Sequence, residues 1–299
     1  NDTNDYSSSS LSLDGKTMTI ANGLNRDEGR AQTAMRRCAA NVAAAVATLL
    51  RPVRRHVQDP WPFDLQRLAI AAAVVVAIFL AVMFLLDAAL IDGVGHLPRW
   101  SVWSFDQITD FGKSGWFLWP LGILFLGLAA LPSLPRVPQL VLAAVMVRVG
   151  FLFVAIGAPS LFDTIIKRMI GRARPLVTGI ADPFVFSPFK WTAEYASLPS
   201  GHATTAFAVA VAFGTLWPRW RTVLWVYALL IAVSRVVLTA HYPSDVLAAA
   251  VVGVVGALLV RRWFALRDLG FSIAPDGVLH QKQGPSLRRI KAVARALLA

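Results

Sequence analysis

The chain has 299 residues, 56% of them hydrophobic, and its mean hydropathy is +0.58. Soluble domains usually contain about 45–50% apolar residues, so the composition excludes an ordinary soluble protein and indicates one that crosses a membrane several times. The net charge of +12 could suggest a nucleic-acid partner, but Lys and Arg gather before and after the apolar segments. That distribution is typical of cytoplasmic flanks beside anionic lipid, so we expect no nucleic acid. The single cysteine, Cys38, excludes an internal disulfide framework and a cysteine-built metal site.

The first 67 residues divide into two segments that precede the apolar part of the chain. Residues 1–34 are polar, rich in Ser, Asn and Asp, and we predict that they are disordered. Residues 35–67 form a basic amphipathic flank. The apolar run within 36–56 is about a dozen residues long, too short to span a membrane, and we interpret it as a helix on the inner leaflet. A cleaved signal peptide is the alternative, against which the long polar lead argues.

Six apolar segments follow, and each is long enough to cross a hydrocarbon core of about 30 Å as a helix. They lie at approximately 68–91, 116–134, 139–164, 202–218, 221–240 and 244–264. The sequence therefore predicts an all-α, polytopic membrane protein whose six-transmembrane-helix bundle occupies 68–264, with a basic cytoplasmic tail at 265–299. Dense Lys and Arg at both ends place both termini in the cytoplasm, which an even number of spans permits.

Three short polar clusters lie at the ends of predicted spans. They read KRMIGRARP over 167–175, SLPSGH over 197–202 and SRVVLTAHYPSD over 234–245. In the predicted topology all three lie on the extracytoplasmic face. Because charged side chains are unfavourable near hydrocarbon, such a gathering at span ends indicates a shared functional site.

Three cations in these clusters are candidates for binding an oxyanion. Arg174 and Arg235 can each offer a planar fork of donors that suits phosphate oxygens, and Lys167 can offer a point charge. Lys167 and Arg174 are two helical turns apart, so both would face one side if the segment stays helical up to Pro175. For Lys167 the alternative is that its ammonium simply extends to the lipid headgroups.

The cluster around Ser200 has the features of an anion site at a helix start. Ser200 is a natural N-cap, and Gly201 allows close approach of a ligand to the backbone. Free amides and the helix dipole favour an anion there, and His202 would stand at the edge of that site. An ordinary capped turn explains the same residues equally well.

His241 and Asp245 form the third candidate group. Their spacing places them on one helix face, or a turn at Pro243 brings them together. A carboxylate that accepts from one ring nitrogen fixes the tautomer and leaves the other nitrogen free to attack phosphorus. With His202 they could instead bind zinc or non-haem iron. The surrounding cations would repel such an ion, so we expect no metal.

Taken in order, K-x6-RP, PSGH and SR-x5-H-x3-D resemble the motifs of the type 2 phosphatidic acid phosphatase (PAP2) superfamily, which also includes vanadium haloperoxidases and bacterial acid phosphatases. The resemblance covers about residues 68–264, and all three motifs match. It implies an α-helical bundle. For membrane members it also implies six spans with the active site on the extracytoplasmic side.

The resemblance also implies a role for each candidate residue. His241 would be the nucleophile that forms a phosphohistidine, Asp245 would orient it, and His202 would protonate the leaving alkoxide. The implied phosphate-binding residues are Lys167, Arg174, Ser200, Gly201 and Arg235. No metal or other cofactor is implied for phosphatase members.

The function that these observations favour is a multi-pass lipid phosphatase of the inner (plasma) membrane, with the bilayer and a lipid phosphate as its partners. Phosphatidic acid, phosphatidylglycerol phosphate, isoprenyl pyrophosphate and lipid A phosphates are the candidate substrates, and the sequence does not select among them. Three alternatives remain: a lipid phosphotransferase, a vanadate-dependent haloperoxidase, and a non-catalytic lipid-binding or transport protein. The last predicts loss of a motif residue, and none is lost. The sequence does not indicate the oligomeric state.

Overall fold

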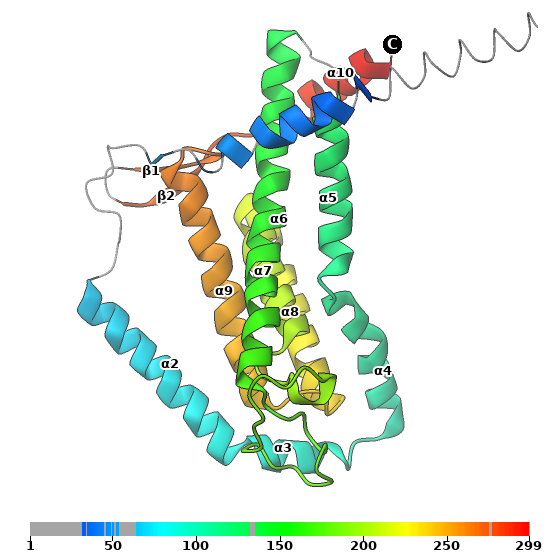
Figure 1. Cartoon of the computed structure of the whole chain (residues 1–299), viewed down its shortest axis with the longest axis vertical. Helices are drawn as coiled ribbons and strands as arrows, with labels where there is room; N and C mark the ends of the chain where they lie inside the picture. Colours follow the sequence, from blue (N-terminus) through cyan, green and yellow to red (C-terminus); the bar gives the residue numbers. More distant parts are fainter. Residues whose placement is uncertain are drawn as a thin grey trace, which may run out of the picture.

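The chain folds as a bundle of long helices with a small hairpin and a short helix at one end (Figure 1). The computed structural model describes residues 32–33, 35–44, 46–48, 50, 52–53, 64–131, 135–274 and 277–298. The predicted disordered segment at 1–34 lies outside the described residues except for 32 and 33. The predicted amphipathic flank is helical at every position described between 35 and 50.

The long helices cross the molecule from end to end, and shorter elements connect them. The long ones are α2 (Leu65–Leu85), α6 (Arg136–Ile170), α8 (Arg221–Val237), α9 (Pro243–Leu266) and the pair α4 (Arg99–Thr109) and α5 (Gly115–Ala130). The shorter ones are α3 (Asp87–Val94), α7 (Gly201–Leu216), α10 (Leu287–Leu298), the strands β1 (Phe271–Ile273) and β2 (Leu279–Gln281), and the 3-10 turns η1 (Asp110–Gly112), η2 (Ala193–Tyr195) and η3 (Pro218–Trp220).

The prediction of a helical membrane protein is confirmed, whereas the count of six spans is not. In the described part of the chain, five helices are long and apolar enough to cross a membrane, with α4 and α5 counted as one. The fourth predicted span, 202–218, corresponds to α7, which has 16 residues and a length of about 24 Å. That is shorter than a hydrocarbon core of about 30 Å.

Helix α7 is surrounded by other helices of the bundle. It packs against α6, α8 and α9, and most of its residues are buried. Many of these are Ala, Gly or Thr, and small residues let neighbouring backbones approach closely. The core therefore lies along α7. The first residues of α7 lie at one end of the bundle.

Two helix boundaries differ from the predicted spans. The first predicted span, 68–91, is divided between α2 and α3, and the break places Asp87 at the start of α3, where it is fully buried. At the third span, α6 continues to Ile170 and ends on Gly171, whose φ is +63°. A Cβ at Gly171 would lie 1.9 Å from the Ser187 carbonyl oxygen, so only glycine fits this turn.

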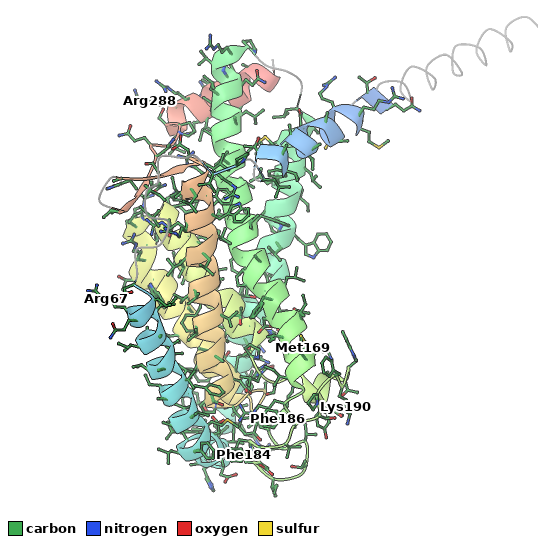
Figure 2. All side chains as sticks on the ribbon, turned by 60° about the vertical axis from the view of Figure 1, so that its left-hand side comes forward. Arg67, Met169, Phe184, Phe186, Lys190 and Arg288 are labelled. Carbon is green, nitrogen blue, oxygen red and sulfur yellow. The ribbon has the colours of Figure 1, made fainter. Side chains whose placement is uncertain are left out.

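The end of the bundle opposite this turn holds a feature that the all-α prediction missed. Strands β1 and β2 form an antiparallel hairpin after α9, and Phe271 of β1 packs against Phe151 of α6, with ring centroids 4.8 Å apart. Arg148 donates to the carbonyls of Ala144 and Lys282, at 2.8 Å each. It therefore joins α6 to the segment after the hairpin. Figure 2 shows Arg288 of α10 at this end and Phe186 and Lys190 at the other.

Candidate active site

The three polar clusters of the sequence meet at the end of the bundle where α6 and α8 finish and α7 and α9 begin. The loop that joins α6 to α7 lies over these helix ends (Figure 1). The backbone N–H of Ser200 donates to the Asp245 carbonyl at 3.2 Å. The ring of His241 is hydrogen-bonded to the backbone carbonyl of Ser197, which lies in the same loop. The three clusters, which lie between residues 167 and 245, thus come together in one site.

The ring of His241 is buried, with 2% of the residue exposed, and it has a defined tautomer. Its Nδ1 lies 2.8 Å from the Ser197 carbonyl oxygen. A carbonyl can only accept, so Nδ1 carries the hydrogen and Nε2 keeps its lone pair. Burial lowers the pKa of His241 to about 4, the opposing attraction of Asp245 being smaller. The imidazole is therefore neutral at neutral pH, as a nucleophile must be.

Asp245 is close to His241, but it does not accept the ring hydrogen directly as expected. Its Oδ2 lies 3.7 Å from Nδ1, beyond hydrogen-bond distance. The carboxylate is occupied by other donors: the Ser197 hydroxyl at 2.5 Å, the Tyr242 amide at 2.9 Å and Arg172 at 2.6 Å. Asp245 follows Pro243 at the start of α9, so the two residues meet across a turn. Asp245 is therefore linked to the His241 ring through Ser197, which bonds to both residues.

Arg172 is the centre of a buried polar group that we call the Arg172 network, consisting of Arg172, Asp87, Ser244 and Asp245. Arg172 is fully buried. It donates to Asp87 at 2.7 Å, to Ser244 at 2.7 Å, to Asp245 at 2.6 Å and to the Pro183 carbonyl at 3.0 Å. The Ser244 amide also donates to Asp87, at 2.9 Å. All three guanidinium nitrogens have acceptors. The network connects α3 and α9 to the loop that joins α6 to α7.

A second polar group faces the start of α7. Lys167 pairs with Asp163 one turn earlier on α6, at 2.5 Å, and the Thr204 hydroxyl donates to the same carboxylate at 3.1 Å. A Cβ at Gly201 would stand 3.0 Å from the Lys167 ammonium and 3.1 Å from Asp163. The missing side chain at Gly201 therefore lets the ammonium approach the first amides of α7.

Three buried donors at this site have no hydrogen-bond partner among the described residues: Nε of Arg174, Oγ of Ser200 and Nε of Arg235. Arg235 is held in place by Thr109 of α4, to which its Nη1 donates at 2.6 Å. An unsatisfied buried polar group is destabilising by about 1–3 kcal/mol. With Lys167 and Gly201 these residues form what we call the cationic cradle. Its free donors and its positive charge fit a bound anion.

Two expectations about the cradle are corrected by the local geometry. Because α6 ends at Gly171, Arg174 does not lie two helical turns above Lys167. The loop carries it instead, and its amide donates to the Glu194 carbonyl at 2.8 Å. Ser200 is the N-cap residue of α7, but its hydroxyl makes no capping bond and is free for a ligand.

His202 lies in the first turn of α7, immediately after Gly201. The 3-10 turn η1 closes one side of it. A Cβ at Gly112 would lie 2.9 Å from the His202 Cβ and 2.7 Å from Ile231 of α8. The His202 side chain is therefore packed against η1 at the start of α7.

Sequence reasoning missed six residues that support the site: Asp87, Thr109, Asp163, Arg172, Ser197 and Ser244. Two kinds of signal were present. Arg172, Ser197 and Ser244 lie inside the quoted motifs, whereas Asp87 and Asp163 are isolated carboxylates inside apolar spans, where an ionisable residue indicates function by default. Thr109 carried no such signal. In the described ranges, no three His, Cys, Asp or Glu side chains gather to hold an ion, so the alternative of a metal site has no set of ligands there.

Comparison with known proteins identifies the family. A profile described as the PAP2 superfamily matches residues 148–268. The Lipid A 1-phosphatase of Rhizobium johnstonii is 35% identical over 197 residues, which cover 65% of this chain and 80% of that protein. This chain belongs to the PAP2 superfamily. The resemblance inferred from the three motifs is thereby confirmed.

A further relative and two solved structures also match part of this PAP2 protein. The Lipid A 1-phosphatase of Rhizobium etli is 36% identical over 174 residues, covering 58% of this chain and 75% of the relative. The crystal structure of Aquifex aeolicus LpxE matches with 21% identity and a TM-score of 0.44, over 58% of this chain and 94% of that one. The transmembrane PAP2 type phosphatidylglycerolphosphate phosphatase of Bacillus subtilis matches with 22% identity and a TM-score of 0.44, over 63% and 93%.

Proposed function

We propose that this protein is a membrane lipid phosphatase that hydrolyses a phosphate ester at the cationic cradle through a phosphohistidine on His241. The observation that carries the proposal is the pairing of two features. The cradle holds buried donors without partners, which suits a phosphate. Beside it, the ring of His241 is buried and keeps a free Nε2 lone pair.

In the first step, Nε2 of His241 attacks phosphorus in line with the bond to the lipid oxygen. His202 takes up a proton when the phosphate anion binds beside it. The N–P bond then forms and the P–O bond breaks, while His202 donates this proton to the departing oxygen. Arg174, Arg235 and Lys167 stabilise the charge that develops on the other phosphate oxygens, and they do so without rearranging because the fold already holds them.

In the second step, water attacks the phosphohistidine. The neutral His202 accepts a proton from that water, the N–P bond breaks, and phosphate leaves with His241 restored to its neutral form. The bond from Nδ1 to the Ser197 carbonyl holds the ring in one orientation through both steps. No metal or other cofactor takes part in this scheme.

The distribution of charge supports a proposal for the location. Basic residues of α10 lie at the end of the bundle opposite the site, and positive charge favours the cytoplasmic side. We therefore propose an inner-membrane protein with cytoplasmic termini and an active site on the periplasmic face. The short helix α7, enclosed by its neighbours, would be the fourth crossing segment in chain order and would bring their number to six.

The relatives suggest which lipid phosphate to test first. Two of them bear the name Lipid A 1-phosphatase, so the 1-phosphate of lipid A is our first choice of substrate. Phosphatidic acid, phosphatidylglycerol phosphate and isoprenyl pyrophosphate complete the panel. All four present a phosphate at headgroup level with hydrocarbon below it, which matches a site at the end of a membrane bundle.

Release of inorganic phosphate from this panel, by purified protein in detergent with a chelator present, tests the proposal. We expect chelator-resistant release from at least one lipid, with a loss of about 10⁴-fold or more in His241→Ala. The variant should keep the melting temperature of the parent. Release that persists in His241→Ala would contradict the mechanism. Transfer of phosphate to an added acceptor lipid without release would indicate a phosphotransferase instead.

A further inference from the structure

An apolar groove with a volume of about 310 Å³ opens on the side of the bundle between α2, α6 and α9. Phe79 of α2, Phe162 and Ile166 of α6, and Ala248 and Val252 of α9 are among its lining residues, and no lining residue is polar or charged. A hollow of this kind differs from the convex surface that most helices present to lipid. Its chemistry suits a hydrocarbon chain.

Three residues that line the groove are close neighbours, in the sequence, of active-site residues. Its lining includes Ile166, which precedes Lys167, and Pro199, which precedes Ser200 of the cradle. Leu247 of α9 also lines it and follows Asp245 by two positions. A molecule lying in the groove is therefore adjacent to the loop and helix ends that hold the phosphate-binding donors.

The groove also runs in the direction that a bound lipid requires. Its α6 wall extends from Ile170, at the site end, to Phe162, and eight residues of helix correspond to about 12 Å. Its α9 wall starts at Leu247, beside the site, and ends at Val252. The long axis thus leads from headgroup level towards the middle of the bundle, parallel to the chains of a lipid in the membrane.

We propose that this groove binds one hydrocarbon chain of the lipid whose phosphate occupies the cationic cradle. The inference rests on the proposed function and adds the part of the substrate that the polar site does not explain. A flexible chain ordered in a preformed groove would fix the depth of the phosphate relative to His241. Burial of each methylene is favourable, so chain length should influence binding.

The first test fills the groove at Ala248, which is half-buried. Ala248→Phe places a ring in the groove and should raise the KM for a long-chain lipid phosphate about tenfold or more. The KM for a short-chain lipid with the same headgroup, and kcat for both lipids, should change less than about twofold. Val255→Phe is the matched control: it lies seven residues later on nearly the same helix face, is 47% exposed and does not line the groove. This variant should behave like the parent.

Two kinetic outcomes would overturn the inference. If Ala248→Phe leaves the long-chain KM unchanged, no substrate chain occupies the groove. If it weakens long- and short-chain lipids equally, the substitution acts on the polar site. A parent protein that releases no phosphate from any lipid would instead contradict the proposed function, and the inference then depends on a binding measurement.

Photolabelling provides that measurement, because it requires no turnover. His241→Ala protein in vesicles is irradiated with a lipid phosphate that carries a photoreactive group in mid-chain, and the labelled peptides are identified. We expect label on the 162–170 and 247–252 segments, competition by unlabelled lipid phosphate, and loss of label in Ala248→Phe. Equal labelling by a probe with a choline headgroup would show that bulk bilayer lipid fills the groove, which would overturn the inference. Label elsewhere on the protein would do the same.

Discussion

The Arg172 network and the cationic cradle lie at the same end of the bundle and both use buried arginine, but they differ in how their donors are satisfied. Each guanidinium nitrogen of Arg172 has an acceptor within 3.0 Å, and two carboxylates balance its charge. In the cradle, Nε of Arg174, Nε of Arg235 and Oγ of Ser200 are buried without partners. The donors of Arg172 are all satisfied by acceptors within the protein, whereas these donors of the cradle need an anion as their acceptor.

This difference separates structural from functional cations where the sequence pattern alone does not. Arg172 and Arg174 are two residues apart in the same motif, and both could be taken as phosphate ligands. Removing one member of a complete buried ion pair leaves the other charge buried and uncompensated, which destabilises the fold. Removing a donor that has no partner within the protein breaks no contact of the fold and weakens only the binding of the ligand. The two arginines should therefore respond to substitution in opposite ways.

Asp245→Asn should have the largest effect, because Asp245 belongs to the Arg172 network and also contacts Ser197, to which the His241 ring is bonded. Its carboxylate neutralises Arg172 and accepts from Ser197, which holds the His241 ring. We expect kcat to fall about 10³–10⁴-fold and the free energy of unfolding to fall by about 3–5 kcal/mol. Phosphate release and thermal melting in detergent measure the two effects. A variant that loses stability but keeps its kcat would show that His241 is oriented without Asp245.

Arg174→Gln should lower kcat/KM about 10²–10³-fold, because one donor to the phosphate oxygens is lost. Its melting temperature should not fall, since the buried Nε satisfies no acceptor within the protein. Arg172→Gln is the matched control, with the same change of side chain two residues earlier. That variant should melt well below the parent. Similar melting temperatures for the two variants would contradict the distinction between network and cradle.

Gly201→Ala should lower kcat/KM by about tenfold, because the added methyl group would lie 3.0 Å from the Lys167 ammonium and displace it from the cradle. The control is Gly127→Ala in α5, where an added Cβ meets no atom within 4 Å. Alanine favours a helix interior over glycine, so this control should be at least as stable as the parent. Equal activity of Gly201→Ala and the parent would show that Lys167 has room to move without loss of function.

The pH dependence should show the smallest change. Burial lowers the pKa of His241 to about 4, so the neutral, nucleophilic ring persists as the pH falls and is lost only near pH 4. We expect kcat/KM, corrected for the ionisation of the substrate phosphate, to fall less than about twofold between pH 7 and pH 5.5. An enzyme ionisation near pH 6.5 on the acidic side would contradict the assignment of a buried, neutral His241.

The sequence predicted the parts of the site that depend on local motifs. Lys167, Ser200, Arg235 and His241 are brought together as expected, because each cluster lies at a helix end and the helices pack side by side. The position of Arg174 was predicted with the wrong geometry. Nothing in the helical spacing reveals that Gly171 adopts a left-handed conformation and turns the chain against Ser187.

The remaining features depend on contacts between distant segments. Asp87 meets Arg172 across 85 positions, and Thr109 meets Arg235 across 126, so no local pattern connects them. The fourth predicted span, 202–218, was taken as a full membrane span for a related reason, since hydropathy does not distinguish a helix surrounded by protein, such as α7, from one surrounded by lipid. The β1–β2 hairpin is three residues per strand, too short to produce a period-two signal.

The measurement that tests the account most directly is the identity of the phosphorylated residue during turnover. Protein mixed with a lipid carrying isotopically labelled phosphate is quenched in alkali within the first turnover, and the labelled peptide is sequenced by mass spectrometry. We predict phosphohistidine at His241, formed and lost at rates consistent with phosphate release and absent from His241→Ala. Label on another residue, or release of phosphate at full rate with no phosphorylated protein in the first turnover, would contradict the account.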